Sequence, residues 1–192
     1  MSVPGGVVLR PLEPMARHTA QRTGGPAQAL LVVHERPLLP QALRLAKDQG
    51  LKVQPLGAGT RVRFRDGPVS GGWIRLGTGF ADLGVEEGLL LAGAAVPLPH
   101  LVQHAIAHGL AGVEDLAGLP GSVGAAIALD EGWEERVEAV EHVHRGKARW
   151  GTLASARRGT CFVTGVRLRV RPDAPQAVAE RARAAARARW SG

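Results

Sequence analysis

The sequence predicts an α+β protein of two lobes, one with a small parallel sheet and the other with an antiparallel sheet. An apolar run at residues 29–33 precedes an amphipathic helix and a second short strand, the order of a parallel strand–helix–strand unit. From residue 69 onward, short apolar runs alternate closely with glycines, a spacing typical of antiparallel strands. With 192 residues and 45% hydrophobic content, the chain can bury a real core.

The first lobe is expected over about residues 15–61. Residues 1–28 are rich in proline, glycine and threonine, so we expect turns or loops there. The strand that follows leads to a helix that Pro37 opens and that ends before Gly50. A strand at residues 51–54 completes the unit.

The second lobe is expected over about residues 62–172. The predicted strands are residues 73–76, 80–83, 89–92, 137–144, 147–151 and 162–170. A helix at residues 97–108 and another that starts near Ser122 lie between them. Residues 173–192 form an Ala/Arg-rich helix, for which a solvated, a docked and a frayed form all stay open.

Composition and charge argue against several classes of protein. The net charge of +7 is compatible with nucleic acid, but the chain has no tyrosine and only three phenylalanines to stack on bases, which argues against it. Cys161 is the single cysteine, which excludes an internal disulfide and fits the cytoplasm. We expect no membrane span and no secretory signal, because the apolar runs are too short.

Several histidines are candidate metal ligands. His100, His104 and His108 share one helix face at a spacing of four residues, which suits zinc. No nearby cysteine or carboxylate completes a ligand set, so we expect a polar helix face and no metal. His142 and His144 are expected on a solvated strand face.

A glycine turn follows the second strand of the parallel unit. The run Gly57-Ala58-Gly59-Thr60-Arg61 places several backbone N–H groups in one concavity, which suits a diphosphate. A plain tight turn is the alternative. The Gly-x-x-x-x-Gly-Lys pattern is missing, so a nucleoside triphosphatase loop is not predicted.

A second glycine segment joins turn residues to a helix start, Gly118-Leu119-Pro120-Gly121-Ser122-Val123-Gly124. Pro120 fixes φ, Gly121 frees it, and Ser122 is placed to cap the first helical N–H groups. A helix start with free N–H groups and small side chains suits a phosphate. The alternative is a tightly packed turn before a buried helix.

Four segments together resemble one family. Residues 19–27, 55–60, 92–98 and 109–124 are similar in order and spacing to UDP-N-acetylenolpyruvoylglucosamine reductase, the MurB flavoenzyme family of bacterial peptidoglycan precursor synthesis. The resemblance covers about residues 15–170. It implies an FAD-binding-type domain over residues 1–172, with the two-lobed fold of vanillyl-alcohol oxidase-type flavoproteins and FAD between the lobes.

The resemblance also implies which residues hold the FAD diphosphate. They are Gly57, Ala58, Gly59, Thr60 and Arg61 of the first segment and Pro120, Gly121, Ser122 and Gly124 of the second. Asp130 and Gly132 fall in a segment that lies close to the flavin in the family. There, Leu129-Asp130-Glu131-Gly132 replaces the family's Met-Asn-Ala-Gly, and Arg61 replaces an asparagine. The added carboxylates lower the expected FAD affinity, and the positive charge of Arg61 would offset this effect if the fold brought it near them.

The implied chemistry is hydride transfer from NADPH through the flavin to an enolpyruvyl ether. Arg157 matches the family's arginine that stabilises the intermediate, and Ala156 replaces the tyrosine before it. The family's proton-donating serine and its glutamate belong to a substrate domain, and the sequence ends at Gly192 before that domain would begin. We therefore expect a cytoplasmic flavoprotein that binds flavin nucleotide without being a complete reductase by itself.

Two alternatives stay open. The lost tyrosine and the Asp130-Glu131 pair also suit a non-catalytic interaction module, with cell-wall synthesis or division proteins as partners. The second alternative is nucleic-acid binding through the arginines of residues 173–192. Such binding would depend strongly on the salt concentration.

Overall fold

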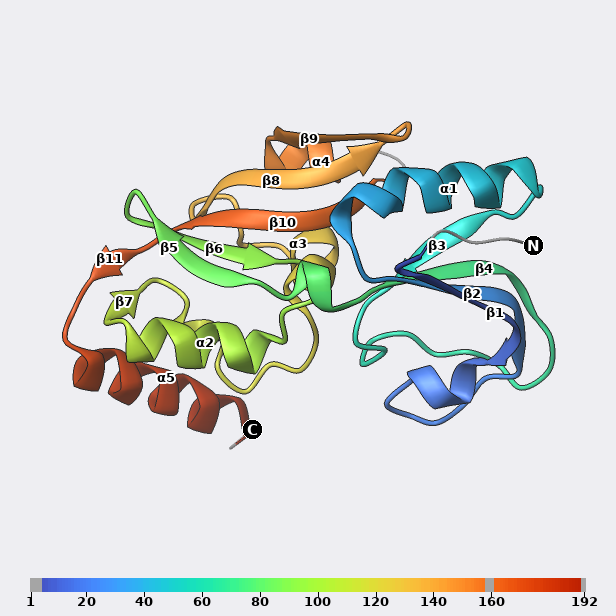
Figure 1. Cartoon of the computed structure of the whole chain (residues 1–192). Helices are drawn as coiled ribbons and strands as arrows, with labels where there is room; N and C mark the ends of the chain where they lie inside the picture. Colours follow the sequence, from blue (N-terminus) through green and yellow to red (C-terminus); the bar gives the residue numbers. More distant parts are fainter. Residues whose placement is uncertain (1–4, 158–160, 191–192) are drawn as a thin grey trace.

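The computed structural model describes residues 5–157 and 161–190 of the chain. Two lobes, each built on one main β-sheet, lie side by side (Figure 1). The N-terminal sheet is on the right of the figure, and the sheet on the left carries helices along its lower side. No helix in the described ranges has both the length and the apolar character needed to cross a bilayer.

The first sheet has four strands in the order β1-β2-β4-β3. β1 runs antiparallel to β2, whereas β2 and β3 flank β4 in parallel. The elements of this lobe are β1 (Val7–Pro14), η1 (Met15–His18), β2 (Pro26–Val33), η2 (Arg36–Leu38), α1 (Leu39–Asp48), β3 (Val53–Leu56) and β4 (Val69–Leu76). The predicted parallel strand–helix–strand unit is therefore confirmed.

The second sheet has five antiparallel strands in the order β5-β6-β10-β8-β9. They are β5 (Leu83–Glu86), β6 (Leu89–Gly93), β8 (Val137–His144), β9 (Lys147–Gly151) and β10 (Phe162–Arg169), and η3 (Thr78–Phe80) precedes them. β10 is central and largely buried, as its dense apolar run leads one to expect. The predicted hairpin of β8 and β9 is confirmed.

Helices cover one side of this second sheet. They are α2 (Leu98–Ala107), η4 (Glu114–Leu116), α3 (Val123–Leu129) and α4 (Leu153–Ala156). The short strands β7 (Leu110–Ala111) and β11 (Arg171–Pro172) pair with each other and bring α5 (Pro175–Trp190) against α2 and η4 (Figure 1).

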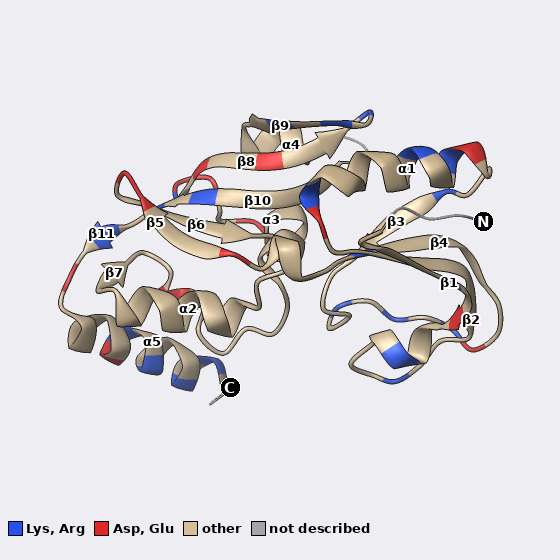
Figure 2. Cartoon of the chain, in the orientation of Figure 1, with Lys and Arg blue, Asp and Glu red and all other residues tan. Residues whose placement is uncertain are grey.

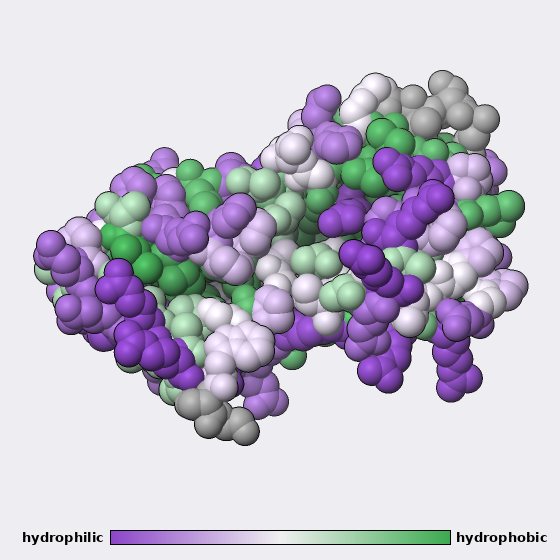
Figure 3. Space-filling model, turned by 90° about the horizontal axis from the view of Figure 1, so that it is seen from below, coloured by the Kyte–Doolittle hydropathy of each residue, from purple (hydrophilic) through white to green (hydrophobic). Residues whose placement is uncertain are grey.

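The arginine-rich helix α5 is docked, one of the three forms that the sequence leaves open. Val178 and Ala182 are buried. Arg181 reaches Glu114 Oε1 with Nε at 2.8 Å and Asp173 Oδ2 with Nη2 at 2.6 Å. Other basic residues of α5 remain along the outer edge of the lobe (Figure 2). Hydrophilic side chains dominate the face seen from below, and hydrophobic ones show mainly in hollows between them (Figure 3).

One apolar cluster spans both sheets and sets their relative position. Leu31 of β2 belongs to the same buried cluster as Val143 of β8 and Phe162 of β10. Beside it, Arg36 donates a hydrogen bond to the carbonyl oxygen of Thr164 at 3.0 Å. Shared packing of this kind holds the walls of any site between the lobes in a defined geometry.

Three strand predictions are wrong. Residues 7–14, expected as loop, form β1, and prolines are tolerated there because β1 is an edge strand. Residues 73–76 belong to the parallel pairing of β4, not to an antiparallel meander. Residues 80–83 are not one strand, because Phe80 is buried through the turn η3 and β5 begins only at Leu83.

The predicted lobe boundary at residue 61 is also wrong. β1 and β4 both belong to the first sheet, so that lobe extends over residues 7–76. The sequence pattern missed this because β4 pairs with β2 and β3, and residues 57–68 separate it from the nearer of these strands. α5 packs on the second lobe and is part of it.

The expectation of a solvated His142 is wrong as well. His142 is fully buried, donates from Nδ1 to the Val140 carbonyl at 3.3 Å, and accepts from Arg149 Nε at 3.4 Å. α4 folds back over this strand face. Gly151 leaves room for it, since a Cβ there would lie 2.6 Å from Ser155 Oγ.

Candidate functional site

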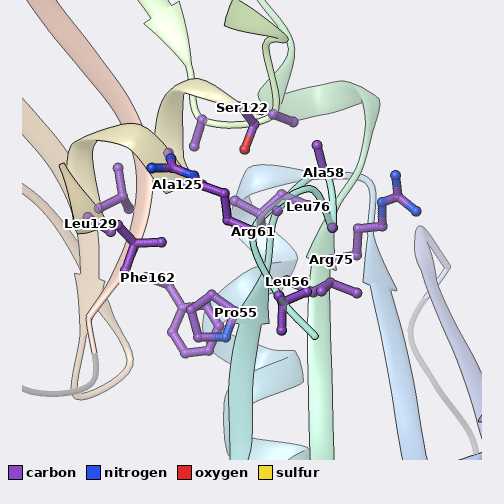
Figure 4. Close-up of a pocket in the computed structure, with 18 of the residues that line it drawn as sticks. Pro55, Leu56, Ala58, Arg61, Arg75, Leu76, Ser122, Ala125, Leu129 and Phe162 are labelled. Atoms are coloured by element: carbon purple, nitrogen blue, oxygen red, sulfur yellow. The ribbon is translucent and has the colours of Figure 1, made fainter. Parts of the chain in front are cut away.

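A cavity of about 330 Å³ opens between the two lobes. Its walls come from the end of β3 and the following turn, from β4, from the β6–α2 loop, from α3 and from the start of β10. Figure 4 shows side chains of these elements around one hollow. The volume lies in the range typical of small-molecule sites.

The glycine turn after β3 forms one wall, and Gly57, Ala58, Gly59, Thr60 and Arg61 all line the cavity. Within the described ranges, the N–H groups of residues 58–61 have no hydrogen-bond partner. Gly59 has a φ of +71°, and its carbonyl accepts from Ala20 N at 2.9 Å. A row of unpartnered donors beside a cavity is an arrangement that binds an anion.

The start of α3 forms the opposite wall, but its first donors are already used. Val123 N donates to Val96 O, and Gly124 N donates to Ala94 O, both at 2.9 Å. The prediction of free N–H groups at this helix start is therefore wrong for these two residues. The predicted capping by Ser122 is also wrong, because its side chain makes no capping hydrogen bond; its hydroxyl points toward the cavity instead (Figure 4).

The two glycine segments face each other across this space. A Cβ at residue 57 would lie 2.9 Å from Ser122 Oγ and 3.1 Å from Ala125 Cβ. A Cβ at residue 121 would lie 3.4 Å from Thr60 Oγ1. Gly57 therefore permits the close approach of the walls, and a larger side chain there would fill the space between them.

An ion pair joins the walls at one edge. Arg61 of the glycine turn pairs with Asp130, the residue that ends α3. Both side chains are about one third exposed, at 36% and 33%. A residue of the glycine turn in the first lobe is therefore held by a carboxylate of the second lobe.

A second cation lines the cavity, and sequence reasoning missed it. Arg75 of β4 places Nη1 3.3 Å from His18 Nδ1, which must accept because arginine has only donors. His18 then carries its proton on Nε2 and donates it to Glu13 Oε1 at 2.9 Å. This bond is the main reason that the pKa of Glu13 is lowered, although burial opposes it. No local pattern connects these three residues in the sequence.

The structure brings Gly57, Ala58, Gly59, Thr60, Arg61, Ser122 and Gly124 to one cavity. Pro120, Gly121, Asp130 and Gly132 are not among its lining residues. A Cβ added at Gly121 would meet only Thr60 Oγ1 within 4 Å, and Gly132 has a φ of +81° with no atom within 4 Å of an added Cβ.

Arg157, the predicted catalytic residue, is not among the described residues that line the cavity. Its Nε donates to Ile127 O at 2.9 Å, its Nη2 donates to Asp130 O, and its Nη1 lies 2.9 Å from Glu134 Oε1. A cation at the last carbonyls of a helix stabilises the helix end. These contacts give Arg157 a supporting position behind α3, and its catalytic role stays a prediction.

The histidines of α2 contact each other. His104 and His108 stack with ring centroids 4.1 Å apart, and His108 Nδ1 donates to His104 O at 2.9 Å. Burial, with a smaller contribution from His108, lowers the pKa of His104. The part of the chain that the structure describes holds no group of three histidine, cysteine or acidic side chains able to share a metal ion.

The profile of the FAD binding domain family matches residues 27–143, which is more than half of the chain. The chain belongs to the FAD binding domain family. FAD is the cofactor of this domain, and the matched residues include the glycine turn and the helix start that line the cavity.

This FAD-binding domain is similar to UDP-N-acetylenolpyruvoylglucosamine reductases, as the sequence motifs predict. It is 40% identical to the reductase of Syntrophotalea carbinolica over 121 residues, which cover 62% of this chain and 40% of the relative. The crystal structure of MurB from Thermus caldophilus matches with a TM-score of 0.80 and 28% identity, over 97% of this chain and 70% of that one. The chain thus spans less than half the length of the Syntrophotalea relative.

More distant solved structures share the fold. Cholesterol oxidase from Brevibacterium sterolicum matches with a TM-score of 0.67 at 14% identity, over 88% of this chain and 38% of that one. An identity this low shows the fold alone. The predicted two-lobed FAD-binding fold is confirmed.

Proposed function

We propose that the cavity between the lobes holds FAD, with its diphosphate on the N–H groups of residues 58–61. The row of unpartnered donors at this turn is the observation that carries the proposal. The hydroxyl of Ser122 points into this space and adds a donor, and Arg75, which also lines the cavity, adds a positive charge. The small side chains around them leave room for a nucleotide to approach the backbone.

We further propose that the chain is the flavin-binding part of a MurB-type reductase of peptidoglycan precursor synthesis. Similarity to these reductases across both lobes supports this assignment. When bound, FAD supplies hydride-transfer chemistry, with NADPH as the proposed hydride source. The chain's own residues bind the diphosphate, orient the nucleotide between two rigid walls, and exclude water with apolar side chains such as Leu76 and Phe162.

The proposal assigns cofactor binding to this chain and assigns no proton donor among its residues. Reduction of the enolpyruvyl ether is proposed for the whole protein, in the cytoplasm where its nucleotide-linked substrate is made. Arg157 acts, in this proposal, by supporting the end of α3.

Uptake of FAD by the purified chain tests the proposal. After incubation with FAD and removal of free flavin, the chain should retain the flavin absorbance bands at one flavin per chain. Gly57→Val should abolish retention without unfolding, because the new side chain meets Ser122 and Ala125 across the cavity.

Gly84→Val is the matched control, since Gly84 lies on β5 and has no atom within 4 Å of an added Cβ. This variant should retain FAD like the unaltered chain. A colourless unaltered chain, or full retention by Gly57→Val, would contradict the proposed site.

A further inference from the structure

Arg61 and Asp130 connect the two walls of the cavity. Arg61 leaves the glycine turn of the first lobe and extends beneath α3 toward Ala125 (Figure 4). Its guanidinium pairs with the carboxylate of Asp130 on the second lobe. Within residues 5–157 and 161–190, neither side chain has another ion-pair partner. In this arrangement, Asp130 balances the charge of Arg61.

Asp130 is supported from behind. Arg157 donates hydrogen bonds to the carbonyl oxygens of Asp130 and Ile127, the latter at 2.9 Å. These bonds hold the backbone at the end of α3. The carboxylate therefore reaches Arg61 from a backbone that is itself fixed, and the pair has a defined place at the cavity edge.

Arg61 lines the same cavity as residues 58–60, whose N–H groups belong to the same turn. A diphosphate carries more negative charge than a carboxylate and accepts paired hydrogen bonds from arginine. A diphosphate at this turn and the carboxylate of Asp130 would compete for one cation. The two anions would also repel each other, because like charges that share one cation lie close together.

We propose that Arg61 exchanges partners, binding Asp130 in the free chain and the diphosphate in the flavin-bound chain. Asp130 then acts as an internal competitor that sets the affinity for phosphate-bearing flavins. The inference rests on the proposed function, because that function places the diphosphate at this turn. It makes Asp130→Asn a substitution that tightens binding, which a merely structural ion pair would not do.

Titration calorimetry with FAD and with riboflavin, which has no phosphate, tests the exchange. Asp130→Asn should tighten FAD binding by about three- to tenfold, and Arg61→Gln should weaken it by a similar factor. In the Arg61→Gln background, Asp130→Asn should tighten binding by a smaller factor, because the competition for Arg61 is gone. Riboflavin affinity should be the same for all these variants.

Two controls separate this effect from net charge and from folding. Asp115→Asn removes the same charge from an exposed pair with Arg136, where Nη1 lies 2.9 Å from Oδ1, and should leave FAD affinity unchanged. Arg61→Lys keeps the positive charge but loses the planar guanidinium with its paired donors. It should weaken FAD binding less than Arg61→Gln does. Urea unfolding of each variant shows whether it is folded. The gain from Asp130→Asn should shrink as salt is raised.

The outcomes distinguish the two proposals. Equal FAD affinity for the unaltered chain and Asp130→Asn overturns the exchange and leaves FAD binding intact. Equal tightening for riboflavin also overturns it, because the effect would not act through phosphate. Failure of every variant to bind either flavin overturns the proposed function, and the exchange with it.

Discussion

The glycine turn at residues 57–61 and the helix start at residues 120–124 look alike in sequence but use their backbones differently. In the turn, the N–H groups of residues 58–61 have no partner within the described ranges. At the helix start, Val123 and Gly124 donate to carbonyls of the β6–α2 loop. Small residues therefore indicate that another group approaches the backbone closely. They do not indicate whether that group belongs to a ligand or to the protein itself.

The glycines of the two segments also differ in what an added Cβ would contact. Gly57 faces Ser122 across the cavity, whereas Gly59 packs on the backbone at His18 and Gly124 packs on Ala94. Of these three glycines, only Gly57 meets side chains of the opposite cavity wall. Substitutions at these positions should separate a role in the fold from a role in binding.

The largest effect is expected at Gly59. Its φ of +71° is strained for any other residue, and an added Cβ would lie 1.9 Å from the carbonyl oxygen of His18. Gly59→Ala should therefore lower the free energy of unfolding by about 3 kcal/mol or more. Urea unfolding measures this loss. An unchanged midpoint would mean that the turn does not depend on glycine at this position.

Gly124→Ala should have the next largest effect. Its Cβ would lie 2.7 Å from Ala94 Cβ, in contact with backbone that cannot easily move. We expect a loss of about 1–3 kcal/mol in the free energy of unfolding. Gly84→Ala, with open space around it, should stay within about 0.5 kcal/mol and serves as control. Equal values for the two variants would refute the close packing of the helix start.

Glu13→Gln tests the charged support of the wall at the glycine turn, through His18 and Arg75. The pKa of Glu13 is lowered in the folded chain, mainly by the hydrogen bond from His18. Its ionised form therefore stabilises the fold above the ordinary glutamate pKa, and this contribution is lost as pH falls through the lowered value. The substitution should cost about 1 kcal/mol at pH 7.

The difference between the unaltered chain and Glu13→Gln should narrow below about pH 4.3. Urea unfolding of both proteins across the acid range measures it. A difference that is constant with pH would show that the charge of Glu13 is not its source.

The smallest effect on stability is expected for Ser122→Ala. An N-cap serine that bonds the helix backbone is worth about 1 kcal/mol, but Ser122 makes no such bond. We therefore expect a loss below about 0.5 kcal/mol, measured by thermal unfolding, together with weaker FAD binding in calorimetry. A loss of about 1 kcal/mol in stability, without any change in FAD affinity, would contradict our assignment of the Ser122 hydroxyl to the cavity.

Sequence reasoning found the parallel unit, the hairpin of β8 and β9, and both walls of the cavity. It did not find β1, because Pro11 and Pro14 favour a loop until an edge position is known. It also missed Arg75, which owes its place in the site to the pairing of β4 with β3. Residues that act through contacts distant in sequence leave no local signal.

The sequence by itself determined the periodicity of the strands and helices, the two glycine segments and their family, because these depend on neighbouring residues and turn chemistry. Tertiary structure alone decided which backbone donors stay free, that Arg61 meets Asp130, and that His18 connects Arg75 to Glu13. The physical reason is that a hydrogen bond or an ion pair requires a partner within a few ångströms. For Arg61, the packing of the two lobes brings that partner near, whereas for Arg75 it is the folding of the first lobe that does so.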